Sequence, residues 1–137
     1  MCLTSLTPQV LAEGATSVKG YFPAAAMWYD IYTGMRVGTG WQTVASPLTH
    51  IPLHLRGGEV YVTQHPALNT VQSRQNPLEV IAALDASGEA SGSLFWDDGE
   101  SLDTYSAGLY TEMAYTVSGG HFKVRERERE REGTCIS

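Results

Sequence analysis

Residues 93–105, SLFWDDGESLDTY, hold the densest group of chemically reactive side chains in the sequence. Four carboxylates fall within seven residues directly after Trp96, namely Asp97, Asp98, Glu100 and Asp103. Carboxylates this close together can act as acid and base, bind a hard cation, contact a sugar, or hold the backbone of a turn. Their spacing decides which of these uses the sequence favours.

The order Asp97-Asp98-Gly99 favours a hairpin turn. Glycine adopts positive φ without strain, and aspartate carboxylates accept hydrogen bonds from nearby backbone N–H groups. Neighbouring strand residues point to opposite faces, whereas the two carboxyls of a glycosidase must face one sugar, about 5–9.5 Å apart. The stretch also lacks the spacing of a calcium-binding loop. We therefore predict turn chemistry, with a sugar or metal contact as the alternative.

Other reactive side chains in the sequence do not combine into a site. His50 and His54 lie in THIPLHLR, where Pro52 and the alternation of apolar residues predict a strand. Four strand steps span about 13 Å, which is too far for two ligands of one ion. Cys2 and Cys135 lack metal-ligand spacing, and the sequence contains neither a phosphate-binding glycine loop nor a nucleophile elbow. We expect no metal and no cofactor.

A second candidate surface is aromatic. GYFPAAAMWYDIYTG, residues 20–34, carries five rings, which either stack on sugars or form a core or domain interface. Arg56 in HLRGG could pair with a carboxylate across a domain contact. The candidate contacts to a sugar or to a neighbouring domain are therefore Tyr21, Trp28, Tyr29, Arg56, Trp96, Asp97 and Asp98. Burial of the rings discriminates between the two uses.

The elements that must position these residues are predicted to be short strands. Period-two alternation indicates a strand at residues 49–56, and residues 59–64, after Gly57-Gly58, read as the second arm of a hairpin. The apolar run at residues 78–84 predicts a central strand covered on both faces. Further strands are expected in MWYDIYT, GWQTV, SLFWD and YTEMAYTV. This pattern predicts an all-β fold, a small antiparallel β-sandwich.

Composition limits the class of protein. The chain has 137 residues, 42% of them hydrophobic, which suits one domain with one core. A net charge of −6 argues against a nucleic-acid partner. The start lacks the features of a signal peptide, and no stretch approaches the roughly 18 apolar residues of a membrane span.

Four stretches together resemble the region that follows the catalytic barrel in glycoside hydrolase family 31, the family of lysosomal and intestinal α-glucosidases. They occur in order and without large gaps: GYFPAAAMWYDIYTG, PLTHIPLHLRGGEV, SRQNPLEVIAALDASGEASGSLFWDDGESLDTY and GLYTEMAYTVS. The resemblance implies a retaining α-glucosidase parent whose two catalytic aspartates lie upstream on a (β/α)₈ barrel. Asp30 shares only the W-x-D frame of the family's nucleophile motif, so no catalytic residue is assigned here.

The resemblance also implies a domain plan. Residues 1–17 resemble the last barrel strand and its exit loop, and residues 18–118 the β-sandwich that packs on the barrel. Residues 119–137 contain an Arg-Glu repeat without an apolar face, so we expect disorder there and hypothesise gene-model read-through.

The expected partners, in the full-length parent, are the barrel and α-glucan substrates, and the parent's compartment is lysosomal or secretory. We expect the chain alone to hydrolyse nothing. The alternative is a stand-alone sugar-binding or structural module.

Overall fold

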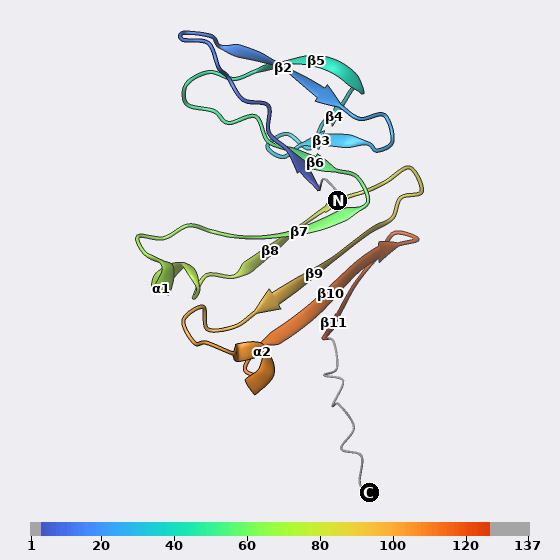
Figure 1. The fold of residues 1–137 in the computed structure, drawn as a ribbon. Coiled ribbons are helices and arrows are strands. Elements are labelled where there is room, and N and C mark those ends of the chain that lie inside the picture. The colour runs from blue at the N-terminus through green and yellow to red at the C-terminus, as the bar shows by residue number, and fades with distance from the viewer. Residues whose placement is uncertain (1–3, 127–137) are drawn as a thin grey trace, which may run out of the picture.

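The computed structural model describes residues 4–126, whose strands form three small sheets (Figure 1). The first sheet has the order β1-β6-β3-β4, made of β1 (Ser5–Leu6), β6 (His54–Arg56), β3 (Trp28–Asp30) and β4 (Arg36–Val37). The second sheet pairs two strands, β2 (Ser17–Phe22) and β5 (Gly40–Ala45). Together these two sheets make one lobe of the molecule, at the top of Figure 1.

The third sheet forms the other lobe. Its order is β11-β10-β9-β7-β8, made of β7 (Glu59–Gln64), β8 (Leu78–Ala83), β9 (Ala90–Trp96), β10 (Thr111–Ser118) and β11 (His121–Glu126). Two single-turn helices lie in its loops, α1 (Thr70–Ser73) between β7 and β8, and α2 (Thr104–Ala107) between β9 and β10. All its strand pairs are antiparallel except β7 with β9, which meet at Glu59 and Ser91.

The core of the first lobe is aromatic. Phe22 packs edge-on against Trp28 and against the imidazole of His54, with ring centroids 5.9 and 4.8 Å apart. All three side chains are fully buried. The indole Nε1 of Trp28 donates a hydrogen bond to the carbonyl of Pro23 at 3.0 Å, so its polar edge is satisfied inside the core.

The core of the second lobe lies on one face of the third sheet. Alternate residues of β7, β9 and β10 point to this face, where Val60, Ala90 and Tyr115 are buried. Partly buried side chains pack around them, namely Val62, Leu94, Met113 and Val117. Gly92 lets β9 pass close to β7, because a Cβ there would collide with the backbone carbonyl of Val60. A side chain at that position would therefore force the two strands apart.

The predicted all-β, sandwich-like fold is confirmed, but two details of strand placement were wrong. Residues 78–83 form β8 at the edge of the third sheet, with mostly exposed side chains, and not a central strand. β6 and β7 do not form a hairpin, since they belong to different sheets. The turn at Gly57-Gly58 instead carries the chain from the first lobe to the second.

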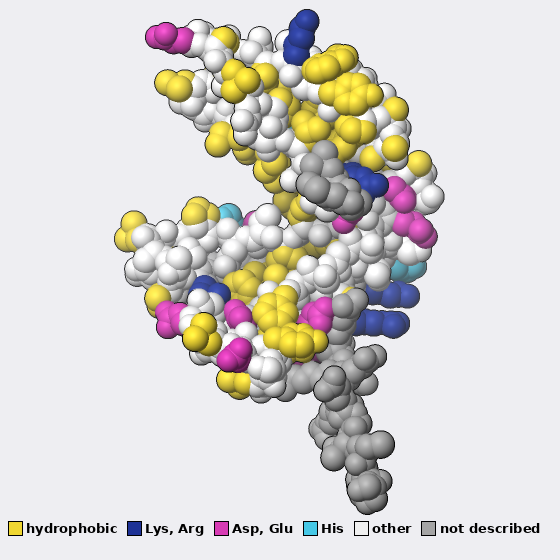
Figure 2. Space-filling view, in the orientation of Figure 1, with side chains coloured by type: hydrophobic (Ala, Val, Ile, Leu, Met, Phe, Trp, Pro, Cys, Tyr) yellow, Lys and Arg dark blue, Asp and Glu magenta, His cyan; other side chains and the backbone are white. Residues whose placement is uncertain are grey.

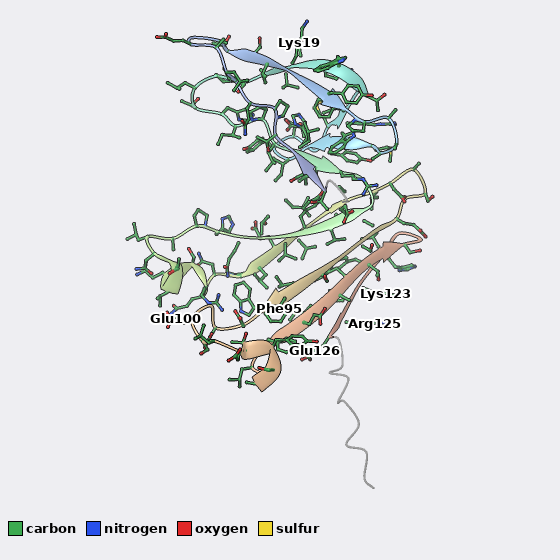
Figure 3. All side chains as sticks on the ribbon, viewed as in Figure 1. Lys19, Phe95, Glu100, Lys123, Arg125 and Glu126 are labelled. Atoms are coloured by element: carbon green, nitrogen blue, oxygen red, sulfur yellow. The ribbon has the colours of Figure 1, made fainter. Side chains whose placement is uncertain are left out.

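The C-terminal boundary also differs from the prediction. Residues 121–126 are not part of a disordered tail but form β11, which pairs with β10 from Ser118–His121 to Met113–Glu126. Lys123 and Arg125 project from one side of this strand, as alternation requires (Figure 3). The rest of the Arg-Glu repeat lies outside the described residues. No described helix is long and apolar enough to cross a membrane.

Candidate functional site

The acidic loop, residues 97–103, follows β9 and leads into α2. The Asp97 carboxylate accepts one hydrogen bond from the backbone N–H of Gly99 at 3.0 Å and another from the Thr104 hydroxyl at 2.8 Å. Thr104 is buried, so Asp97 ties the start of α2 back to the end of β9. This carboxylate is engaged at both of its oxygens.

Asp98 forms the turn itself. One carboxylate oxygen accepts backbone N–H bonds from Glu100 and Ser101 at 3.1 and 2.9 Å, and the other accepts the Ser101 hydroxyl. These bonds, with the Ser101 hydroxyl contributing most, lower the pKa of Asp98 to about 2. The side chain is therefore ionised at any physiological pH and is a poor acid or base near neutrality.

The turn role predicted for these aspartates agrees with this geometry, although the expected tight hairpin is absent. β9 and β10 pair from Trp96–Thr111 to Ala90–Val117, but a long connection containing α2 joins them. The described residues also contain no group of three or more His, Cys, Asp or Glu placed to hold a metal ion. The hydrogen bonds of Asp97 and Asp98 hold the backbone of the acidic loop and the start of α2.

Trp96 has a partner that the sequence analysis missed. The guanidinium of Arg74, directly after α1, lies over the indole ring with its Cζ 4.3 Å from the ring centroid. An Arg74 N–H also donates to the backbone carbonyl of Asp97. Arg74 therefore joins the β7–β8 loop to the acidic loop, and it covers a face of the Trp96 ring that a sugar would otherwise contact.

The other candidate residues lie in the first lobe, in separate environments. Trp28 is only 1% exposed, so it belongs to the core and offers no ring face to a sugar. The Tyr29 hydroxyl donates to the carbonyl of Leu84 at 2.8 Å, and Arg56 approaches Glu59 at 3.4 Å. The structure does not bring the seven candidate residues together into one site.

Tyr21 differs from Trp28 in that it is 51% exposed, so its ring could be reached by a ligand. It sits opposite Trp41 in the β2–β5 pair, and the two rings meet edge-on at a centroid distance of 5.5 Å and an angle of 60°. These rings share no common plane on which a sugar could lie flat. The pair is therefore an exposed aromatic patch without the geometry of a stacking platform.

The first lobe also carries an apolar groove between two segments, residues 7–16 and 46–52. The segments meet where the N–H of Ser46 donates to the carbonyl of Thr16 at 2.8 Å. The apolar part of the lining consists mainly of Pro8, Val10, Pro47, Leu48, Ile51 and Pro52. Leu48 is fully exposed and Ile51 is 67% exposed, so most of their apolar surface lies in water in this chain. We call this feature the β1 groove, because residues 7–16 directly follow β1.

One wall of the β1 groove is held in place by an aromatic contact. The Tyr32 hydroxyl donates to the carbonyl of Ile51 at 3.0 Å, and its ring lies 4.5 Å from the imidazole of His50. Ile51 is therefore presented outward by a fixed backbone rather than by a loop without tertiary contacts.

Comparison with known proteins identifies relatives of this chain. Residues 6–61 match the family described as glycosyl hydrolase family 31 C-terminal domain. Glucoamylase 1 of Candida albicans is 46% identical over 132 residues, which cover 88% of this chain and 14% of the relative. Lysosomal alpha-glucosidase of Bos taurus is 38% identical over 134 residues, covering 85% of this chain and 14% of the relative. The chain thus spans about one-seventh of these relatives.

Solved structures agree with the sequence comparison. The glucosidase II alpha subunit, crystallised with Glc1Man2 bound, superimposes with a TM-score of 0.83 at 25% identity, covering 93% of this chain and 14% of that one. A Flavobacterium johnsoniae GH31 dextranase shares the fold, with a TM-score of 0.74 at 22% identity, over 88% of this chain and 15% of the dextranase.

Proposed function

Because the chain belongs to glycoside hydrolase family 31 through its C-terminal domain, we propose that it supports the catalytic barrel of an α-glucosidase. The whole enzyme would hydrolyse the O-glycosyl bonds of α-glucans with aspartates located on that barrel. The domain's part is mechanical: it covers apolar barrel surface and keeps the barrel strands in place. Catalysis depends on the mutual placement of nucleophile, acid and substrate, so the domain acts only through the barrel.

The observation that carries this proposal is the β1 groove. Large apolar side chains exposed side by side are unfavourable in water and mark surfaces that pack against another protein element. The groove adjoins β1, whose register with β6 joins Ser5 to Leu55 and fixes the N-terminal segment on the lobe. In the family's order of domains, the barrel precedes this segment, which supports a position of the barrel next to the groove.

The chemistry of the acidic loop supports the same division of labour. Asp97 and Asp98 are engaged in turn hydrogen bonds, and Asp98 is ionised far below neutral pH. Neither is arranged as an acid and base facing a common substrate. The bond-breaking groups are therefore to be sought outside the described residues.

A chimeric enzyme tests the proposal. Residues 4–126 replace the aligned region of the Candida albicans glucoamylase 1, and hydrolysis of maltose is measured in the purified chimera. We expect an active chimera whose activity falls about tenfold or more with Leu48→Asp, because an unpaired carboxylate buried in an apolar contact costs more than about 1.4 kcal/mol.

Leu68→Asp is the matched control. Leu68 is 96% exposed in the loop between β7 and β8, far in sequence from the groove, and its replacement should leave activity unchanged. If Leu48→Asp and Leu68→Asp chimeras were equally active and equally stable, the β1 groove would not face the barrel.

A further inference from the structure

Three aromatic rings form a nearly parallel stack on the second lobe. Phe95 of β9 lies against Tyr110 with ring centroids 4.7 Å apart at 22°, and Tyr110 lies against Tyr105 of α2 at 5.3 Å and 14°. Tyr110 is common to both contacts, so it is the middle member of the stack. We call these residues the aromatic stack.

The aromatic stack is exposed to solvent. Tyr105 is 72% exposed and Phe95 46% exposed, and Leu102 and Leu109 are exposed beside them in sequence. Figure 2 shows hydrophobic side chains gathered on the visible face over α2 and the adjoining parts of β9 and β10. Figure 3 labels Phe95 near the end of β9, beside β10. Since exposed aromatic surface is unfavourable in water, a grouped and ordered set of rings marks a binding surface.

The loop holds Tyr105 in a fixed position. The Thr104 hydroxyl donates to Asp97, and the N–H groups of Gly108 and Leu109 donate to the carbonyls of Tyr105 and Thr104 at 3.1 and 2.8 Å. The backbone that carries the ring of Tyr105 is thus held in place, and the ring itself lies against Tyr110. Pre-organisation of this kind reduces the entropy lost on binding.

We propose that the aromatic stack binds an α-1,4-glucan chain, with one glucose unit lying flat on the outer face of Tyr105. A glucopyranose ring has an apolar C–H face, which is attracted to the electron-rich face of an aromatic ring, and a rim of hydroxyls that stay in contact with water. One free ring face at the end of a stack receives one sugar of a curved α-glucan. A flat β-linked chain would need several rings side by side in one plane.

A nearby carboxylate suits the hydroxyl rim of the sugar. Glu112 pairs in register with Phe95, and directly opposed residues of antiparallel strands lie on the same face of the sheet. The choice of an α-glucan rests on the proposed function, whereas the position of the site rests on the ring geometry of this chain.

The test uses the full chain without the barrel. Wild type and Tyr105→Ala are compared by electrophoresis through gels containing glycogen and by calorimetric titration with maltoheptaose. We expect retardation and saturable binding for wild type, and an affinity loss of about twofold to tenfold for Tyr105→Ala, as the strength of ring–ring contacts suggests. Tyr105→Phe keeps the ring and should bind as wild type does.

Trp41→Ala provides the control, because Trp41 is an equally exposed aromatic residue whose neighbour Tyr21 meets it edge-on. It should retain full binding. The proposal is overturned if wild type is not retarded, if Tyr105→Ala binds as tightly as wild type, or if cellohexaose binds as well as maltoheptaose. It is also overturned if Tyr105→Ala converts a dimer into a monomer, since the stack would then be an interface between copies. None of these results depends on the chimera, so the two proposals fail separately.

Discussion

Asp98 illustrates how a carboxylate that looks reactive in sequence is committed to its own turn. Its pKa of about 2 lies below the ordinary 3.8, so between these values the folded chain binds fewer protons than the unfolded chain. Its hydrogen bonds therefore stabilise the fold fully above about pH 4, and this contribution is lost as the pH falls through the folded pKa. Because the Asp98 carboxylate is fully exposed, solvent screens its charge and its hydrogen bonds stabilise only the turn.

Replacing Ser101 by Ala tests this account. The change removes the hydroxyl that contributes most to the shift, so the pKa of Asp98 should rise from about 2 toward 3.8. Carboxyl-carbon NMR titration measures it directly. Glu100→Ala is the control, since Glu100 contacts Asp98 through its backbone N–H. An unchanged pKa in Ser101→Ala would show that the backbone donors alone produce the shift.

His54 is a different kind of residue, because it is buried in the aromatic core beside Phe22. Its Nδ1 is the buried side-chain atom that lacks a hydrogen-bond partner within residues 4–126. Burial lowers its pKa below 6.5, although a hydrogen bond with the Leu6 backbone and the nearby Asp30 act in the opposite direction and His50 reinforces the shift. The neutral imidazole is therefore the form that the core accommodates.

Acidification should destabilise the chain through His54. Its folded pKa is depressed, so its neutral form is accommodated without penalty above about pH 6.5, and stability falls as the pH drops below that value. We expect the urea midpoint to decrease between about pH 7.5 and about pH 5, and to decrease less in His54→Gln. Equal slopes in the two proteins would place the pH dependence on other groups.

At the scale of elements, the close parallel pairing of β7 and β9 joins the two halves of the third sheet. The two strands meet at Glu59–Ser91, and the next step places Gly92 against Val60. Arg74 bridges the loops at the far end of the same strands by its contacts with Trp96 and Asp97. β7 and β9 are thus in close contact at Gly92 and Val60, and the loops that follow them are joined by the guanidinium of Arg74.

Gly92→Ala should force β7 and β9 apart. The added Cβ would meet the Val60 carbonyl oxygen and approach its Cβ to 3.0 Å, and such overpacking costs about 1–3 kcal/mol. Urea denaturation gives the change in free energy of unfolding. Ser91→Ala, at a neighbouring exposed position, should change it by less than about 0.5 kcal/mol. Comparable stability of the two variants would mean that the strands separate without strain.

At the scale of the whole molecule, each of the two lobes has only a few buried residues. The cores around Trp28 and around Val60 are small, and large apolar side chains remain exposed, as the hollow flanked by hydrophobic side chains between the lobes illustrates (Figure 2). A surface of this kind suits a domain that completes its packing against a larger body. The chain spans about one-seventh of the length of its relatives, so each relative contains much more protein than the matching region.

The chain by itself should not hydrolyse maltose. Its carboxylates are held in turns, and the proposed catalytic groups belong to the barrel. Glucose release from maltose by the purified chain, measured against a mock purification, should equal the background. Turnover above background that disappeared with Asp97→Asn or Asp98→Asn would contradict both the turn assignment and the supporting role.

Local features of this protein could be predicted from its sequence. The strand predicted from alternation at residues 110–117 corresponds to β10, and those predicted at residues 59–64 and in SLFWD correspond to β7 and β9, although β9 begins earlier, at Ala90. The turn at Asp98 follows from hydrogen bonds between residues two and three positions apart. Such features depend on the φ and ψ angles of a few adjacent residues. The order of the family's motifs along the chain likewise indicated the family before any packing was known.

Contacts between distant segments were decided by tertiary structure alone. β8 is the last strand in the order of the third sheet, and its apolar sequence could not indicate this edge position. The cation–π contact of Arg74 with Trp96, and the stack of Phe95, Tyr110 and Tyr105, join residues whose approach depends on the path of whole loops. Burial of Trp28 and exposure of Tyr21 arise in the same way, because a ring's environment is set by what the rest of the chain places around it.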